Sequence, residues 1–64
     1  MRKEKWRVCG ENGGLFTNLK SACDCAREVS KYEGLTGVVL IEDGCVYIEF
    51  DDGKKVYDEW NIKK

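Results

Sequence analysis

The sequence predicts one small α+β domain of the order β-β-α-β-β-β. An N-terminal hairpin and a C-terminal three-stranded meander form an antiparallel sheet, and one amphipathic helix packs on one face of it. Two Asp-Gly pairs, Asp43-Gly44 and Asp52-Gly53, lie between runs rich in Val, Ile, Tyr and Phe, which is the strongest short-range hairpin signal. Helical periodicity occurs once, between residues 18 and 33. The domain is expected to span residues 1–64, with residues 1–4 and 63–64 frayed.

The first hairpin is predicted from residues 5–17. Residues 5–9, KWRVC, alternate apolar and polar side chains, as a strand with one buried face does. Residues 10–14 contain three glycines and an asparagine, which tolerate positive φ and can turn the chain back onto residues 15–17. This glycine-rich loop lacks both the Gly-x-Gly-x-x-Gly and the P-loop patterns, so no phosphate site is expected there.

The helix is predicted over residues 18–33. Thr17 or Asn18 can cap its first amides, and Gly34 can take the left-handed conformation that ends it. Charged residues occupy one half of the helical wheel and are expected to face solvent. The half predicted to pack on the sheet contains Leu19, Ala22, Cys23, Cys25, Ala26, Val29 and Tyr32.

The meander follows from residue 35 to residue 57. A three-residue loop at residues 51–53, with Gly53 at a bulge position, is the preferred turn, because it opposes Glu49 with Lys55 and Tyr47 with Tyr57. A two-residue loop would instead oppose Phe50 with Lys55. In either register, unbroken alternation places Tyr47 and Glu49 on the opposite face from Ile48 and Phe50.

Residues 38–41, VVLI, are apolar on both faces, yet one helix can cover only one side of a sheet. Either Val39 and Ile41 or Val38 and Leu40 are therefore expected beside Tyr47 on the face that the helix leaves open. Trp60 and Ile62 can fold back over this face or leave it for a partner.

Composition argues against several function classes. The chain has no histidine and no recognisable nucleophile with an adjacent base, so we expect no enzymatic activity. The four cysteines include no Cys-x2-Cys pair, and the chain has no secretory signal pattern and no run long enough to span a membrane. We therefore expect reduced thiols, no metal, no cofactor, no membrane contact and a cytoplasmic location.

The main functional hypothesis is a protein-binding or regulatory module that uses the second sheet face, with a partner protein or a second copy as ligand. An aromatic and aliphatic patch with an acidic rim is typical of interfaces. The acidic surface also fits a phage-type inhibitor of a basic protein, and the small, proline-free chain is compatible with a phage or prophage origin. The site residues expected on this face are Val39, Ile41, Tyr47, Glu49, Tyr57 and Trp60.

The alternative hypothesis is nucleic-acid binding. Residues 1–31 carry seven Lys and Arg against four acids, a balance of +3, although the whole chain has a net charge of −1. A basic surface could contact phosphates while an aromatic residue stacks on bases. The residues expected to do so are Lys5, Trp6, Arg7, Lys20, Arg27 and Lys31.

Overall fold

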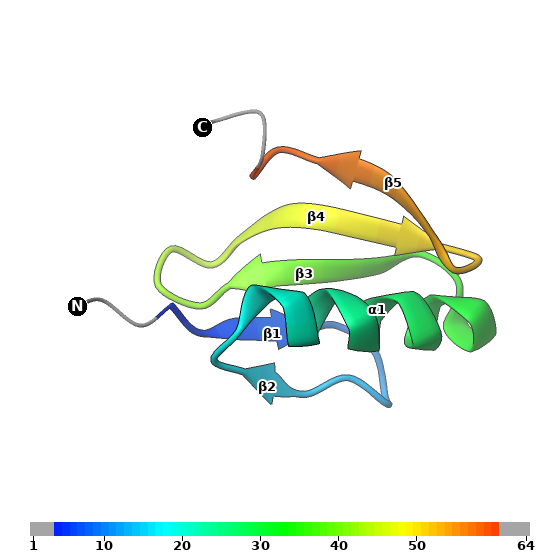
Figure 1. Ribbon diagram of the computed structural model, residues 1–64, viewed down its shortest axis with the longest axis horizontal. Coiled ribbons are helices and arrows are strands. Elements are labelled where there is room, and N and C mark those ends of the chain that lie inside the picture. The colour runs from blue at the N-terminus through cyan, green and yellow to red at the C-terminus, as the bar shows by residue number, and fades with distance from the viewer. Residues whose placement is uncertain (1–3, 61–64) are drawn as a thin grey trace.

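The computed structural model describes residues 4–60, so residues 1–3 and 63–64 of the predicted frayed ends, and Ile62, lie outside the described residues. The predicted α+β architecture is confirmed, with all strand pairs antiparallel and the sheet order β2-β1-β3-β4-β5 (Figure 1). The elements are β1 (Trp6–Val8), β2 (Leu15–Phe16), α1 (Leu19–Glu33), β3 (Thr36–Leu40), β4 (Cys45–Asp51) and β5 (Lys54–Asp58).

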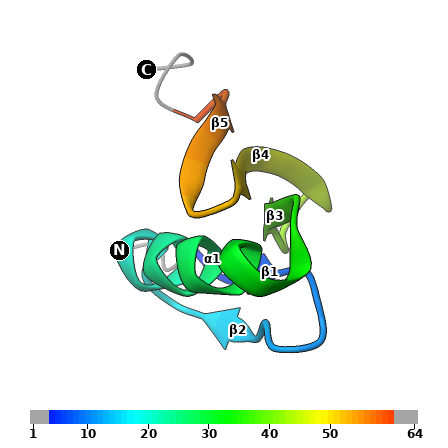
Figure 2. The same ribbon diagram turned by 90° about the vertical axis from the view of Figure 1, so that its right-hand side faces the viewer.

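The helix lies on one face of the sheet only. In Figure 2, β2 lies below α1 and β4 and β5 lie above it, so the sheet curves around the helix. The concave face therefore packs against the helix, and no helix of residues 4–60 lies on the outer, convex face. Strand β1 pairs with β3 as well as with β2, so β3 is the middle strand of the sheet.

The first hairpin closes through backbone contacts that require a glycine. The Val8 N–H donates to the Gly14 carbonyl at 2.9 Å. A Cβ placed on Gly13 would lie 1.9 Å from the Val8 carbonyl oxygen, so no residue with a side chain fits at position 13. The glycine-rich segment is thus a close backbone turn, as predicted.

Helix α1 begins and ends at the predicted caps. The Asn18 side chain accepts from the N–H groups of Lys20 and Ser21, and the Gly34 N–H donates to the Ser30 carbonyl. One residue of the predicted apolar half is misplaced, because Tyr32 is 81% exposed. The buried residues of the helix are Ala22, Ala26, Val29 and Ser30, and Tyr32 lies outside this stripe.

Two residues of α1 tie loops to the helix. The Glu33 carboxylate accepts from the backbone N–H groups of Glu11 and Asn12, which holds the β1–β2 loop. Ser30 is 1% exposed; its hydroxyl accepts from the Gly53 N–H at 2.8 Å, and its carbonyl accepts from the Asp52 N–H. The sequence reasoning assigned no role to either residue.

A β-bulge in β4 overturns the predicted alternation. Val38 opposes Ile48, but Val39 opposes Val46, so Tyr47 is an extra residue in the ladder. Tyr47 consequently turns to the helix side and is buried, while Val46 turns to the opposite face. The prediction that Tyr47 lies on the open face is therefore wrong.

The preferred register of the last hairpin is also wrong. Phe50 opposes Lys55 and Glu49 opposes Tyr57, so a two-residue turn is followed by a bulge at Val56. Asp52 and Gly53 both have positive φ, 54° and 78°, which is the type I′ geometry that suits the twist of an antiparallel pair. The two hydrogen bonds to Ser30 stabilise this turn as well.

The core lies between α1 and the concave face. Trp6 is 1% exposed and meets the rings of Tyr47 and Trp60 edge to face, at centroid distances of 6.4 and 5.1 Å. Trp60 is half-buried beside this cluster, so it folds back on the concave side and not over the open face. The buried core consists of Trp6, Val8, Ala22, Ala26, Val29, Val38, Leu40, Tyr47, Ile48 and Phe50.

Candidate protein-binding surface

The strand register defines which side chains share the convex face, because directly opposed residues of antiparallel strands point to the same side. One row crosses four strands as Leu15, Arg7, Val39 and Val46. A second row crosses the other end as Gly37, Glu49 and Tyr57. We call this surface the open face, and its residues are Arg7, Leu15, Gly37, Val39, Val46, Glu49 and Tyr57.

Apolar side chains are prominent on the open face. Leu15 is 68% exposed, Tyr57 43% and Val46 38%, and Val39 is half-buried between its neighbours on β1 and β4. A Cβ on Gly37 would lie 3.3 Å from Cγ1 of Val46, so the Val46 side chain covers the glycine. The centre of the face is consequently smooth and aliphatic.

Arg7 and Glu49 are the charged members of the open face, and strand alternation directs Lys5, Asp51 and Lys54 to the same convex side nearer its borders. Arg7 is exposed on β1 and Glu49 half-buried on β4, and neither has an ion-pair or hydrogen-bond partner for its side chain among residues 4–60. The Tyr57 hydroxyl donates to Glu59 Oε1 at 2.7 Å, and this hydrogen bond raises the pKa of Tyr57. The rim is therefore basic toward β1 and acidic toward β4 and β5.

The structure brings together only part of the predicted protein-binding site. Val39, Glu49 and Tyr57 lie on the open face as expected, and Ile41 borders it after β3, where its N–H donates to the Lys5 carbonyl. Tyr47 and Trp60 belong to the concave side. Sequence reasoning missed Val46 and Leu15, although the apolar run Val46-Tyr47-Ile48 is a signal that strict alternation is broken.

The predicted acidic rim is dispersed. Asp58 opposes Ile48, on the concave side, and accepts from the Lys55 ammonium at 2.7 Å. Asp43 accepts from the Tyr47 hydroxyl and from the Cys45 N–H, so it fixes the β3–β4 turn. Glu49 is a member of the open face, and Asp51, two residues further along β4, points to the same side. The acids expected in the rim are Glu42, Asp43, Glu49, Asp51 and Asp58.

The residues of the nucleic-acid alternative are also dispersed. Trp6 is buried and cannot stack on a base. The guanidinium of Arg27 lies over the Phe50 ring at 5.5 Å, and Lys20 and Lys31 pair with Asp24 and Glu28 on the exposed side of α1. Strand alternation places Lys5 and Arg7 on the convex side of the sheet, away from the helix. No single surface contains the six residues.

Both edges of the sheet are poor templates for another strand. Edge strand β2 has two residues, and edge strand β5 carries Lys54 and Lys55 before the bulge at Val56. Short strands, lysines and bulges are the usual protection against edge-to-edge pairing. The face of the sheet, rather than its edge, is therefore the available contact surface.

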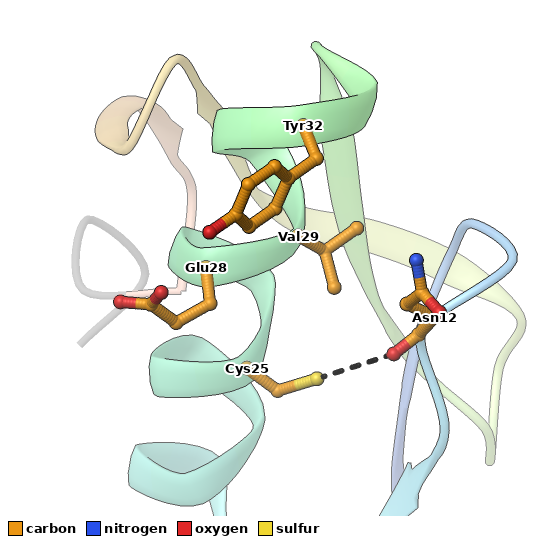
Figure 3. A pocket seen from close by; sticks show the side chains of 5 residues that line it. All are labelled: Asn12, Cys25, Glu28, Val29 and Tyr32. Atoms are coloured by element: carbon orange, nitrogen blue, oxygen red, sulfur yellow. Dashed lines mark hydrogen bonds between the residues drawn. The ribbon is translucent and has the colours of Figure 1, made fainter.

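A groove of about 260 Å³ runs between α1 and the β1–β2 loop (Figure 3). The Cys25 thiol in its wall donates to the Asn12 carbonyl at 3.8 Å, and the Asn12 amide donates to Glu33. Its Glu28 carboxylate is paired with Lys31. The groove is smaller than the roughly 300–1,000 Å³ of ordinary ligand pockets, and these polar groups are already engaged. Its lining residues are Asn12, Cys25, Glu28, Val29 and Tyr32.

The four cysteines are thiols, and within residues 4–60 no three His, Cys, Asp or Glu side chains are grouped so that they could hold a metal ion. Burial raises the pKa of the Cys23 thiol, whereas Cys9 and Cys45 are exposed. The one helix in the described part of the chain is not long and apolar enough to cross a membrane.

Comparisons of the chain with protein-family models, with curated proteins and with solved structures find no match. The arrangement of the described side chains is thus the basis for a functional proposal.

Proposed function

We propose that the chain is a non-enzymatic protein-binding module whose contact surface is the open face. One observation carries the proposal. The one helix of the described residues covers one face of a five-stranded sheet. The other face presents four apolar side chains in two neighbouring rows across the strands: Leu15, Val39 and Val46 in one row and Tyr57 in the next. An apolar face with an aromatic member and charged surroundings is typical of protein interfaces.

The distribution of hydrogen bonds supports the same surface. Buried polar side chains of the concave side are satisfied within the described chain, whereas Arg7 and Glu49 on the open face have no such partner there. Charged groups of this kind determine the orientation and specificity of a partner more than its affinity. The apolar rows would supply the buried area, and the two charges would select the partner.

Nucleic-acid binding receives less support. Phosphate contact needs several basic groups on one surface, but the helix lysines pair with acids and Arg7 lies on the convex side of the sheet. The buried Trp6 offers no stacking platform. No described arrangement favours this function over protein binding.

The proposal is tested by photo-crosslinking from two matched tyrosine positions. Tyr57, 43% exposed on the open face, and Tyr32, 81% exposed on the helix, are each replaced by p-benzoylphenylalanine. In a lysate of the source cells and with the purified chain alone, discrete protein adducts are expected from position 57 and not from position 32. Adducts from position 32 with none from position 57 would refute the open face as the contact surface.

A further inference from the structure

We infer that the open face binds the open face of a second copy of this chain, about a twofold axis that runs along β3. The inference rests on the proposed function and names its partner. It arises from the strand order, β2-β1-β3-β4-β5, in which β3 has two strands on each side. A rotation about β3 that brings two such faces together places β1 of one copy over β4 of the other, and β2 over β5.

This placement brings opposite charges of the two copies together. Arg7 lies on β1 and Glu49 on β4, so each guanidinium faces the side of the partner that carries the carboxylate, twice in the dimer. Arg7 and Glu49 lie in adjacent rows. Along the strand direction these rows are two residues, or about 6.7 Å, apart. A long arginine side chain spans such a diagonal across sheets packed about 10 Å apart.

The same operation matches the apolar residues. Leu15 on β2 and Tyr57 on β5 lie in the rows of Arg7 and Glu49 respectively, so they face each other with the same diagonal offset. Val39, on the middle strand, lies beside the axis and meets Val39 of the other copy. One geometry therefore brings together the central valines and the charged pairs, as an isologous interface requires, with Leu15 and Tyr57 at its margin.

The dimer is expected to be weak. The face is convex, so contact is concentrated on β1, β3 and β4, which have three, five and seven residues. Such a contact falls below the roughly 800 Å² per partner of standard stable interfaces. We expect a dissociation constant on the order of 100 µM, so association is observable at millimolar chain concentrations and absent at micromolar ones.

Charge reversal provides the test, by sedimentation equilibrium of the full chain at low salt. Wild type is expected to approach twice the mass of one chain at about 1 mM. Arg7→Glu and Glu49→Arg each create two like-charge contacts and should each weaken association at least tenfold. An equimolar mixture of the two variants restores both ion pairs, as does the double variant R7E/E49R, so both samples should dimerise again. Lys20→Glu makes the same charge change on α1, outside the interface, and should behave as wild type.

Several results would overturn the inference: a wild-type chain that stays monomeric at 1 mM, single variants that associate like wild type, a mixture that fails to recover, or a loss with Lys20→Glu equal to that with Arg7→Glu. Crosslinking separates this failure from failure of the proposed function. A monomeric chain that still forms an adduct with another protein from position 57 loses the second copy as partner but keeps the open face. A monomeric chain without any adduct from position 57 loses both.

Discussion

The two faces of this sheet are built from similar residues but have different environments. On the concave face Val8, Val38 and Ile48 are at most 3% exposed under α1, whereas on the open face Val46 is 38% exposed and is covered by no helix within residues 4–60. The polar groups differ in the same way, because the buried Ser30 is fully engaged and Arg7 and Glu49 are not. The hydrophobicity of a sheet face therefore does not by itself show that the face belongs to the core. The core lies on the face that α1 covers.

The largest expected difference between the faces is in stability. Trp6→Ala removes the ring that contacts Tyr47 and Trp60 and should cost about 3–5 kcal/mol, comparable to the whole stability of so small a domain. Leu15→Ala, on the open face, should change the free energy of unfolding by less than about 0.5 kcal/mol. Urea unfolding followed by far-ultraviolet circular dichroism measures both. Equal losses in the two variants would remove the distinction between core and open face.

A smaller loss is expected when the anchor of the last turn is removed. Ser30→Ala leaves the partly buried Gly53 N–H without its side-chain acceptor, which should lower the free energy of unfolding by about 1–3 kcal/mol. Ser21 is exposed on the same helix, so Ser21→Ala is the matched control and should have little effect. The same unfolding assay applies, and a Ser30→Ala variant as stable as the control would show that the turn does not depend on this contact.

The alkylation rates of two cysteine thiols allow the two sides of the sheet to be compared. Cys9 follows the buried Val8, is exposed, and lies by Gly37 of the open face, whereas Cys23 lies on the helix near Lys55 and Asp58. Because burial shields the sulfur of Cys23 and raises the pKa of its thiol, alkylation by iodoacetamide should be slower at Cys23 than at the exposed Cys9. Peptide mass spectrometry of a time course measures this. Faster labelling of Cys23 would indicate that its packing against the core does not shield it.

The smallest expected contrast is in the pKa of two tyrosines, Tyr47 on the concave side and Tyr57 on the open face. The hydrogen bond to Asp43, aided by desolvation, raises the pKa of Tyr47 to about 12, from an ordinary value near 10. The folded state thus favours the protonated hydroxyl, so this stabilisation is complete below about pH 10 and is lost as the pH rises through about 12. Tyr47→Phe should remove the latest tyrosinate absorbance step. A variant that keeps that step would assign it to another residue.

The parts of the fold that depend on local sequence could be predicted. Asn18 and Gly34 cap the helix because their chemistry suits those positions in any surroundings, and the Asp-Gly pairs mark both turns of the meander. The glycines of residues 10–14 likewise predicted a close turn. Each of these features depends on a few neighbouring residues, so a single sequence contains enough information.

The features that were missed depend on contacts between distant segments. Alternation along β4 assumes an unbroken ladder, but the bulge at Tyr47 lets adjacent Tyr47 and Ile48 both face the helix, where Trp6 and Trp60 pack on the tyrosine. The register of the last hairpin is set partly by Ser30, more than twenty residues earlier. The candidate site changed accordingly, since Val46 and Leu15 replaced Tyr47 and Trp60.

Valine methyl groups offer the most direct measurement, because four of the six valines divide evenly between the two faces of the sheet. Val8 and Val38 are buried under α1, and Val39 and Val46 lie on the open face. Methyl spectra of the chain are recorded on dilution from about 1 mM to about 20 µM, across the dissociation constant expected for a weak dimer. Shifts confined to Val39 and Val46, with Val8 and Val38 unchanged, are the predicted result. Concentration-independent spectra, or shifts of Val8 and Val38 alone, would contradict the use of the open face for self-association.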